Sequence, residues 1–160
     1  MEENLAIDGR YSVRSPMQWS GERHRGFTTA DEPCRPIAPG GAEVARQRRE
    51  EGSLLNWMER LIRRRRECPE LGWGSCTLIE TAEPAVMAHR ADWDGGTVVA
   101  VHSLADEPLS PVVQVGDAEA VVDLFADEEL TPRNGAVEVA LEPYGHRWFR
   151  LRHPGQRVAP

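Results

Sequence analysis

The pattern of hydrophobic and polar positions changes twice along this chain. Residues 1–41 show neither helical nor strand periodicity, and a stretch of that length without regular elements is usually functional or part of a larger body. Apolar residues then recur every three or four positions, which predicts a helix over 53–67 with one buried face. Ser53 is expected to cap its start, and Pro69 prevents its continuation. A shorter helical turn is predicted around Val44–Gln47.

From Thr77 onward, short runs rich in β-branched residues are separated by turn residues. Strands are predicted at 77–81, 85–90, 97–103, 111–115, 120–125, 136–141 and 146–151. Asp94-Gly95-Gly96 and Asn134-Gly135 are typical hairpin turns. Because no helix separates these runs, we expect antiparallel pairing, and seven short strands favour a sandwich.

Composition and charge narrow the function classes. The chain has 160 residues, of which 40% are hydrophobic, and no apolar run approaches the roughly 18 residues needed to cross a bilayer. Residues 76–160 carry 6 arginines against 14 acidic residues, so nucleic acid is a poor candidate partner. Three cysteines without Cys-x-x-Cys spacing and five scattered histidines predict reduced thiols in a cytoplasmic protein, with no metal or cofactor site.

The segment Arg14-Ser15-Pro16-Met17-Gln18-Trp19-Ser20, followed by Gly26-Phe27, carries the most specific chemistry. Proline fixes its own backbone and restricts the residue before it, so Ser15-Pro16 holds a defined turn. Indole and phenyl faces pack on the C–H faces of sugars, while guanidinium and amide groups hydrogen-bond to hydroxyls. The composition therefore suits a loop that meets a polar, ring-shaped ligand.

Together with Glu3-Asn4-Leu5 and Gly9-Arg10, this segment resembles the loop after the eighth barrel strand of α-amylase-family glycoside hydrolases. Within that family the resemblance is closest to trehalose synthases, oligo-1,6-glucosidases and α-glucosidases. Ser53–Gly74 resembles their last barrel helix and its exit, and His89–Asp94 resembles part of their C-terminal β-domain, as does Pro143–Trp148. One departure is Glu43, which stands where the family usually has asparagine.

The resemblance implies an α+β, mainly β chain in which the loop and last helix of a (β/α)8 barrel precede an antiparallel β-sandwich. Residues 1–70 would form the tail of the barrel, 71–153 the sandwich, and 154–160 a disordered tail.

The resemblance also implies retaining chemistry on α-glucosides such as maltose, trehalose or maltooligosaccharides. That reaction needs a carboxylate nucleophile and a carboxylic acid about 5 Å away, and the resemblance adds a third aspartate. None of the family motifs that carry these groups is present. Arg90-Ala91-Asp92 has an arginine-x-aspartate spacing, but it enters a predicted turn without a preceding Gly-Phe, so we assign no catalytic residue.

Arg14 is the one candidate substrate-binding residue. The resemblance implies that it borders the subsite of the transferred sugar and pairs with an upstream carboxylate. A structural ion pair is an alternative, and without a barrel the side chain would be exposed and flexible.

The remaining aromatic and amide side chains favour packing over binding. We expect Gln18 and Trp19 to shape the loop, and Phe27 to anchor it or to line the entrance of the site. A second group lies near or within the sandwich: Trp73 is expected to plug its junction with the helix, Tyr144 and Trp148 to be core residues, and Trp93 to stack on a glucan or fold over the sheet edge.

Three functions fit these observations. The chain could be the C-terminal fragment of an α-glucoside-processing enzyme, inactive alone; a β-sandwich that binds α-glucans; or a subunit that completes a barrel carried by another chain. The sequence favours the first, because an independent binding module has no need for a barrel helix. Its exposed apolar stripe would cost about 1.5–3 kcal/mol per large side chain.

Overall fold

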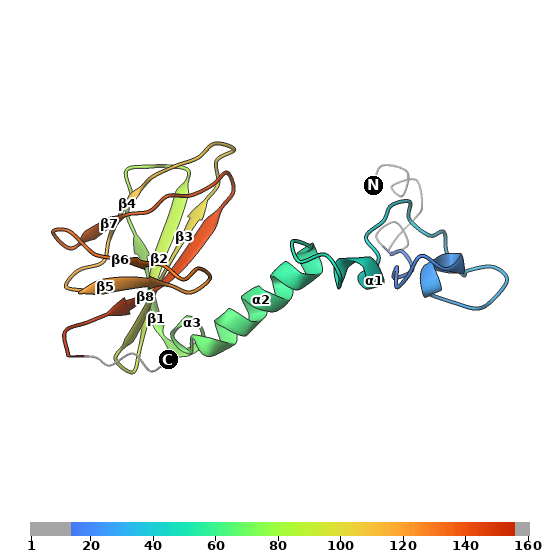
Figure 1. Cartoon of the computed structure of the whole chain (residues 1–160), viewed down its shortest axis with the longest axis horizontal. Helices are drawn as coiled ribbons and strands as arrows, with labels where there is room; N and C mark the ends of the chain where they lie inside the picture. Colours follow the sequence, from blue (N-terminus) through green and yellow to red (C-terminus); the bar gives the residue numbers. More distant parts are fainter. Residues whose placement is uncertain (1–13, 156–160) are drawn as a thin grey trace. The chain divides into compact units, whose positions relative to one another are not determined.

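The computed structural model describes residues 14–155, and the chain divides into two compact units between Ile62 and Arg63. Figure 1 labels the elements, and each unit is described by itself. The predictions for Glu3-Asn4-Leu5, for Gly9-Arg10 and for most of the tail over 154–160 lie outside the described residues.

The first unit contains the aperiodic stretch and little regular structure. Its elements are η3 (Arg23–Gly26), α1 (Val44–Gln47) and the first part of α2 (Leu54–Glu67). The short turn α1 is confirmed, and Val44 is its buried residue. The element η3 was not predicted, and it contains two left-handed residues, His24 and Arg25, with φ of 52° and 56°.

Helix α2 begins and ends where the sequence predicts. The Ser53 hydroxyl accepts a hydrogen bond from the Asn56 amide at 3.3 Å, which is the geometry of an N-cap. The Asn56 side chain in turn donates to the carbonyls of Gln47 and Glu50, at 2.9 and 2.8 Å. The apolar face of the helix is exposed, as expected for a barrel helix without its barrel: no residue of this fully described helix is buried, and Leu54 is 68% exposed.

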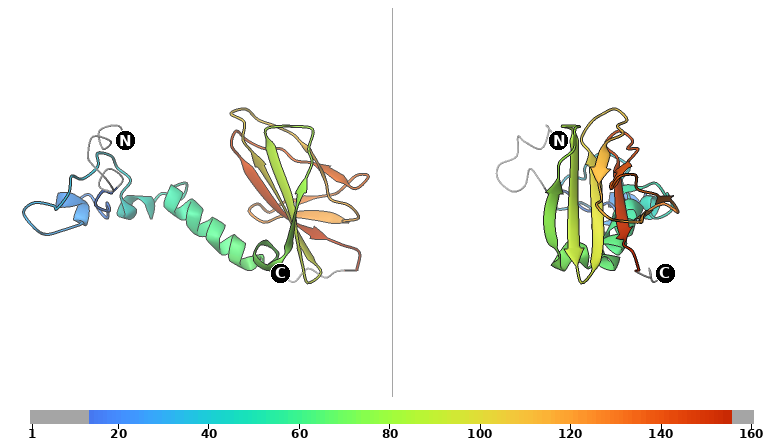
Figure 2. Two further views of the ribbon diagram at one scale, coloured as in Figure 1. Left: turned by 180° about the vertical axis from the view of Figure 1, so that it is seen from behind. Right: turned by 90° about the vertical axis from the view of Figure 1, so that its left-hand side faces the viewer.

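The second unit is a β-sandwich that follows a short helix, α3 (Glu70–Trp73). The strands are β1 (Ser75–Ile79), β2 (Val86–Trp93), β3 (Gly96–Ser103), β4 (Val112–Gln114), β5 (Ala120–Asp123), β6 (Glu129–Leu130), β7 (Ala136–Glu138) and β8 (His146–Arg152). All pairs are antiparallel, in a sheet of order β1-β2-β3-β8-β5-β6 and a small sheet β4-β7, as Figure 2 shows from two sides. The predicted mainly β, antiparallel fold is confirmed; the two-residue strand β6 was missed.

Two turns set the register of this unit. Asp94 and Gly95 have φ of 47° and 78°, and they join β2 to β3 so that Trp93 pairs with Gly96. Asn134 and Gly135, with φ of 53° and 75°, turn the chain before β7. A two-residue turn with both φ values positive suits the twist of a hairpin, and Asp-Gly and Asn-Gly adopt it most readily.

The core lies between the small sheet and one face of the large sheet, called here the inner face. Val99 and Val101 of β3 alternate onto this face, and Phe149 and Leu151 of β8 pack beside them. The small sheet and its flanks contribute Val113, Val115, Val137, Val139 and Leu141. All of these side chains are nearly or wholly buried, so the sandwich has a continuous aliphatic core of its own.

Helix α3 packs against β2 and β3, and at Gly74, directly after the helix, the backbones are too close to leave room for a side chain. A Cβ at Gly74 would lie 2.4 Å from the Glu70 carbonyl oxygen and 2.6 Å from that of Asp92. Glu70 is buried there, with a carboxylate oxygen 3.5 Å from the Arg150 guanidinium. The glycine therefore fixes how the chain enters the sandwich.

We expect Gly74→Ala to destabilise the second unit by about 1–3 kcal/mol, because both neighbouring atoms belong to the backbone and cannot swing away. Thermal unfolding followed by circular dichroism should show a melting temperature lower by several degrees. Gly52→Ala is the matched control, since nothing lies within 4 Å of an added Cβ there. Equal melting temperatures for the two variants would contradict this account.

Candidate functional site

The loop after Arg14 is held in shape by Gln18 and Trp19. Their carbonyl oxygens accept hydrogen bonds from the Val44 and Ala45 amides at 3.0 and 2.9 Å, and the Gln18 side chain donates to the Ala38 carbonyl at 3.0 Å. These bonds tie the loop to the start of α1. Their pattern agrees with the expectation that both residues shape the loop, although the Trp19 side chain is 49% exposed.

A tight turn closes the loop at Gly26. The Trp19 and Ser20 amides donate to the Arg25 carbonyl, at 2.8 and 3.1 Å. Gly26 has φ +67°, and a Cβ there would lie 2.6 Å from the Ser20 hydroxyl, so the position requires glycine. Phe27 follows, 43% exposed, and lines an open hollow with five other residues: Glu22, Arg23, Gly26, Thr28 and Thr29.

Arg14 and Glu43 have different environments. Arg14 is exposed. Glu43 precedes α1 without capping it, and its carboxylate instead forms an ion pair with the Arg25 guanidinium. The residue that departs from the family pattern therefore links the start of α1 to the tight turn.

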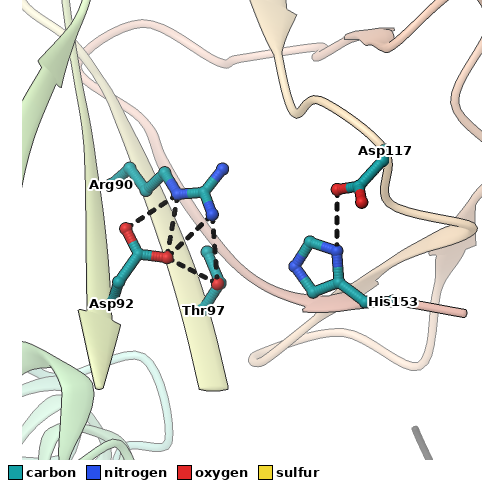
Figure 3. Close-up of polar contacts among 5 residues, drawn as sticks. All are labelled: Arg90, Asp92, Thr97, Asp117 and His153. Carbon is teal, nitrogen blue, oxygen red and sulfur yellow. Dashed lines mark hydrogen bonds and ion pairs between the residues drawn. The ribbon is translucent and has the colours of Figure 1, made fainter. Parts of the chain in front are cut away.

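Arg90 and Asp92 form an ion pair in which both carboxylate oxygens accept hydrogen bonds, as shown in Figure 3. The Arg90 Nε donates to both Asp92 oxygens at 2.9 and 2.8 Å, and the Thr97 hydroxyl donates to Asp92 Oδ1 at 2.7 Å. The guanidinium lowers the pKa of the Asp92 carboxyl, and the carboxylate raises that of Arg90. With its oxygens already engaged, Asp92 is poorly suited to attack a sugar.

The two buried carboxylates of the second unit also have structural partners. Asp123 accepts hydrogen bonds from the Phe125 and Ala126 amides at 2.6 and 2.8 Å and pairs with the Arg147 guanidinium. Glu70 lies beside Arg150. A retaining glycosidase needs one carboxyl that carries a proton and a second, about 5 Å away, that is free to attack. Neither buried acid meets that description.

Three expectations about aromatic residues are wrong. Trp73 does not plug the junction, because its side chain is 75% exposed. Tyr144 is not in the core: it has φ 52° in the turn before β8 and is 69% exposed. Trp148, expected in the core, is partly buried on the opposite, outer face of the large sheet, edge-on to Phe125.

Trp93 lies at the end of β2, 46% exposed, with its ring centroid 6.5 Å from that of Trp73. Sequence reasoning missed this contact, since the two residues are twenty positions apart and belong to different elements.

Three histidines form a row across the outer face of the large sheet, called here the imidazole row. His102 of β3 stacks against His89 of β2 and His146 of β8, with ring centroids 6.1 and 6.2 Å apart. Burial lowers the pKa of all three, and the neighbouring imidazoles lower that of His102 further. Their spacing in the sequence gives no sign of the row, which follows from the strand register.

Metal ligands, reactive thiols and membrane-spanning helices could also indicate a function within residues 14–155. No cluster of three or more histidine, cysteine or acidic side chains there could hold a metal ion. Cys34, Cys68 and Cys76 are free thiols, and burial raises the pKa of Cys68. No helix in that range is both long and apolar enough to span a bilayer.

Comparison with known proteins agrees with this architecture. Residues 95–150 match the family model described as the sucrose hydrolase-like C-terminal domain. Over 94% of its length the chain is 31% identical to a trehalose synthase/amylase of Mycobacterium tuberculosis. It is 25% identical to an oligo-1,6-glucosidase of Bacillus cereus, again over 94% of its length. The trehalulose synthase MutB from Pseudomonas mesoacidophila has a similar structure, with a TM-score of 0.71 at 26% identity over 94% of this chain.

The chain covers little more than a quarter of each of these proteins: 28%, 27% and 27% of their lengths. The fold and the matches resemble those of the C-terminal region of α-amylase-family enzymes. Residues 95–150 resemble the sucrose hydrolase-like C-terminal domain, and the chain is similar to trehalose synthases and oligo-1,6-glucosidases. The resemblance drawn from the sequence is confirmed.

The imidazole row predicts a specific loss of stability in acid. A histidine whose pKa is lower in the folded chain takes up its proton more readily when unfolded. Stability is therefore full above the ordinary pKa of 6.5 and falls as the pH drops below it, by about 1.4 kcal/mol for each unit by which a pKa is lowered. His102→Gln should weaken this dependence, measured as the melting temperature of the second unit between about pH 7 and 5.

His24→Gln, in the first unit, is the control and should leave the dependence unchanged. An unaltered pH dependence in His102→Gln would show that the row does not resist protonation.

Proposed function

We propose that this chain supplies the C-terminal region of an α-glucoside-processing enzyme of the trehalose synthase or oligo-1,6-glucosidase type, and that it is inactive alone. In this proposal residues 1–70 are the tail of a catalytic barrel, and 71–153 are the sandwich attached to it. The relatives' names, trehalose synthase/amylase and oligo-1,6-glucosidase, support the substrate class that the sequence suggests, α-glucosides such as maltose, trehalose or maltooligosaccharides. We place the enzyme in the cytoplasm.

The exposed stripe of α2 is the observation that carries the proposal. Leu54, Met58 and Ile62 recur every four residues along one face and are 68%, 40% and 48% exposed. Each such side chain left in water forgoes about 1.5–3 kcal/mol of burial free energy. Surface helices of complete proteins bury that stripe against a core. A catalytic barrel supplied by residues other than those of this chain would provide the missing surface.

The catalytic groups of the proposed enzyme would also lie in the barrel and not in this chain. The described acids with the deepest burial are engaged by arginines and backbone amides, so the attacking carboxylate and the proton donor belong to the barrel. In barrel enzymes such groups lie at the ends of several strands, beside the loops that follow them. The loop that begins at Arg14 would complete this rim, with the guanidinium donating to a sugar hydroxyl or pairing with a carboxylate of the barrel.

A variant of the proposal is a subunit that completes a barrel carried by a separate chain. The same α2 stripe favours it, since a partner would cover the stripe equally well. Native mass spectrometry of material from the cells that make the protein separates the two, because only the variant gives a complex with a second, barrel-bearing chain.

We expect the purified chain to release no glucose from maltose and to form no maltose from trehalose, measured by chromatography of the sugars. Turnover by the chain alone would contradict the proposal. The complementary experiment replaces the matched C-terminal region of the Mycobacterium tuberculosis relative with this chain, which should preserve activity on trehalose.

In that chimera Arg14→Ala should lower kcat/KM by about tenfold or more, as expected for a lost charged hydrogen bond to the sugar or to a site carboxylate. Arg23→Ala, another exposed arginine of the same loop region, is the control. Equal kcat/KM values for the two variants would remove Arg14 from the substrate site.

A further inference from the structure

Trp73 and Trp93 form an exposed aromatic pair, called here the indole platform. The rings have centroids 6.5 Å apart and planes inclined by 37°, and the side chains are 75% and 46% exposed. Tryptophan is highly buried on average in folded proteins. Two adjacent indoles in water therefore mark an interaction surface more strongly than scattered aliphatic residues do.

The scaffold holds both indoles on fixed backbone. Trp73 ends α3, where its amide donates to the Pro69 carbonyl at 2.9 Å, and the next residue, Gly74, packs directly on the Asp92 carbonyl. Trp93 ends β2 and pairs with Gly96 across the two-residue turn. Because Gly96 has no side chain, this residue of β3 does not cover the Trp93 ring. A preformed aromatic surface loses little conformational entropy on binding.

Exposed polar residues lie close to the two tryptophans along the chain. Asp94 directly follows Trp93 and is exposed, and Ser75 lies two residues after Trp73 with its side chain also exposed. The exposed Arg65 guanidinium donates to the Leu71 carbonyl at 3.4 Å, two residues before Trp73. An apolar face with an acid, a hydroxyl and a guanidinium nearby in the chain suits a sugar, whose rings have C–H faces and hydroxyl edges.

The tilt of the rings favours one class of glycan. An α-linked glucan coils, so successive sugar rings are turned relative to one another, whereas a β-1,4-linked glucan is a flat ribbon. Two indoles inclined by 37° complement a turned pair of sugar rings better than a flat one.

We propose that the indole platform binds α-linked glucan chains at a site separate from any catalytic pocket. The choice of an α-linked glucan rests in part on the proposed function, whose substrates are α-glucosides. Such a site would hold a long substrate on the enzyme while its end is processed.

The test uses the full chain and maltoheptaose, followed by tryptophan fluorescence and by isothermal titration calorimetry. We expect binding with a dissociation constant of about 1 mM, weakened about tenfold or more by Trp73→Ala and by Trp93→Ala. Tyr144→Asn is the matched control, because that ring is 69% exposed beyond the opposite end of β3, where its amide donates to the Ala105 carbonyl, and it should leave affinity unchanged. Trp73→Tyr keeps an aromatic face and should retain most of the affinity, which separates loss of the platform from loss of fold.

Cellohexaose, which is β-linked, should bind at least about tenfold more weakly than maltoheptaose. The proposal is overturned by absence of maltoheptaose binding up to about 10 mM, by binding that survives Trp73→Ala, or by equal affinity for cellohexaose. These outcomes are distinguishable from failure of the proposed function: an active chimera with no glucan binding removes only the platform, and glucan binding beside an inactive chimera removes only the enzymatic role.

Discussion

The register of the β2–β3 hairpin is the constraint on which the second unit depends. Asp94 and Gly95 accept positive φ values, so Trp93 faces Gly96 and every residue along the two strands is assigned to a face. A slip by one residue would move Val99 and Val101 out of the core and bring the histidines into it. The same register aligns His89, His102 and His146 across three strands and brings Trp93 beside α3. One turn thus positions the core, the imidazole row and the indole platform.

The charged groups of this unit are used for structure. Asp92 and Asp123 each accept several hydrogen bonds, including those of an arginine, and Glu70 lies beside Arg150. A carboxylate with these partners is fixed in place, as a fold requires, and the Arg90 guanidinium also lowers the pKa of Asp92. A glycosidase needs the opposite: one carboxyl that retains its proton near neutral pH and another free to form a bond. The arrangement of these acids is therefore consistent with a supporting region whose chemistry lies elsewhere.

The sequence predicted what depends on local pattern and missed what depends on pairing between distant segments. Alternation located seven strands, Ser53 marked the start of α2, and glycine after Asp94 and Asn134 marked two turns. The strand Glu129–Leu130 is too short to show a period, and only its pairing with β5 defines it. The expectation of a core Tyr144 failed because the residue lies in a left-handed turn before the strand, where alternation no longer applies. For the candidate sites, the loop around Gln18 and Trp19 was accessible from composition, whereas the Trp73–Trp93 contact needed the packing of α3 on β2.

The two exposed apolar surfaces call for different partners because their chemistry differs. The α2 stripe is aliphatic and continuous, so only a packed protein surface can offset its exposure through close contact along several turns. The indole platform consists of two side chains on fixed backbone, with exposed polar residues next to them in the chain, and so small a surface would contribute little to a stable protein interface. A ligand with an apolar face and hydroxyl edges can pack on the two indole rings and hydrogen-bond to the polar residues near them. The helix is therefore best explained by a catalytic body, and the tryptophans by the sugar that such a body would process.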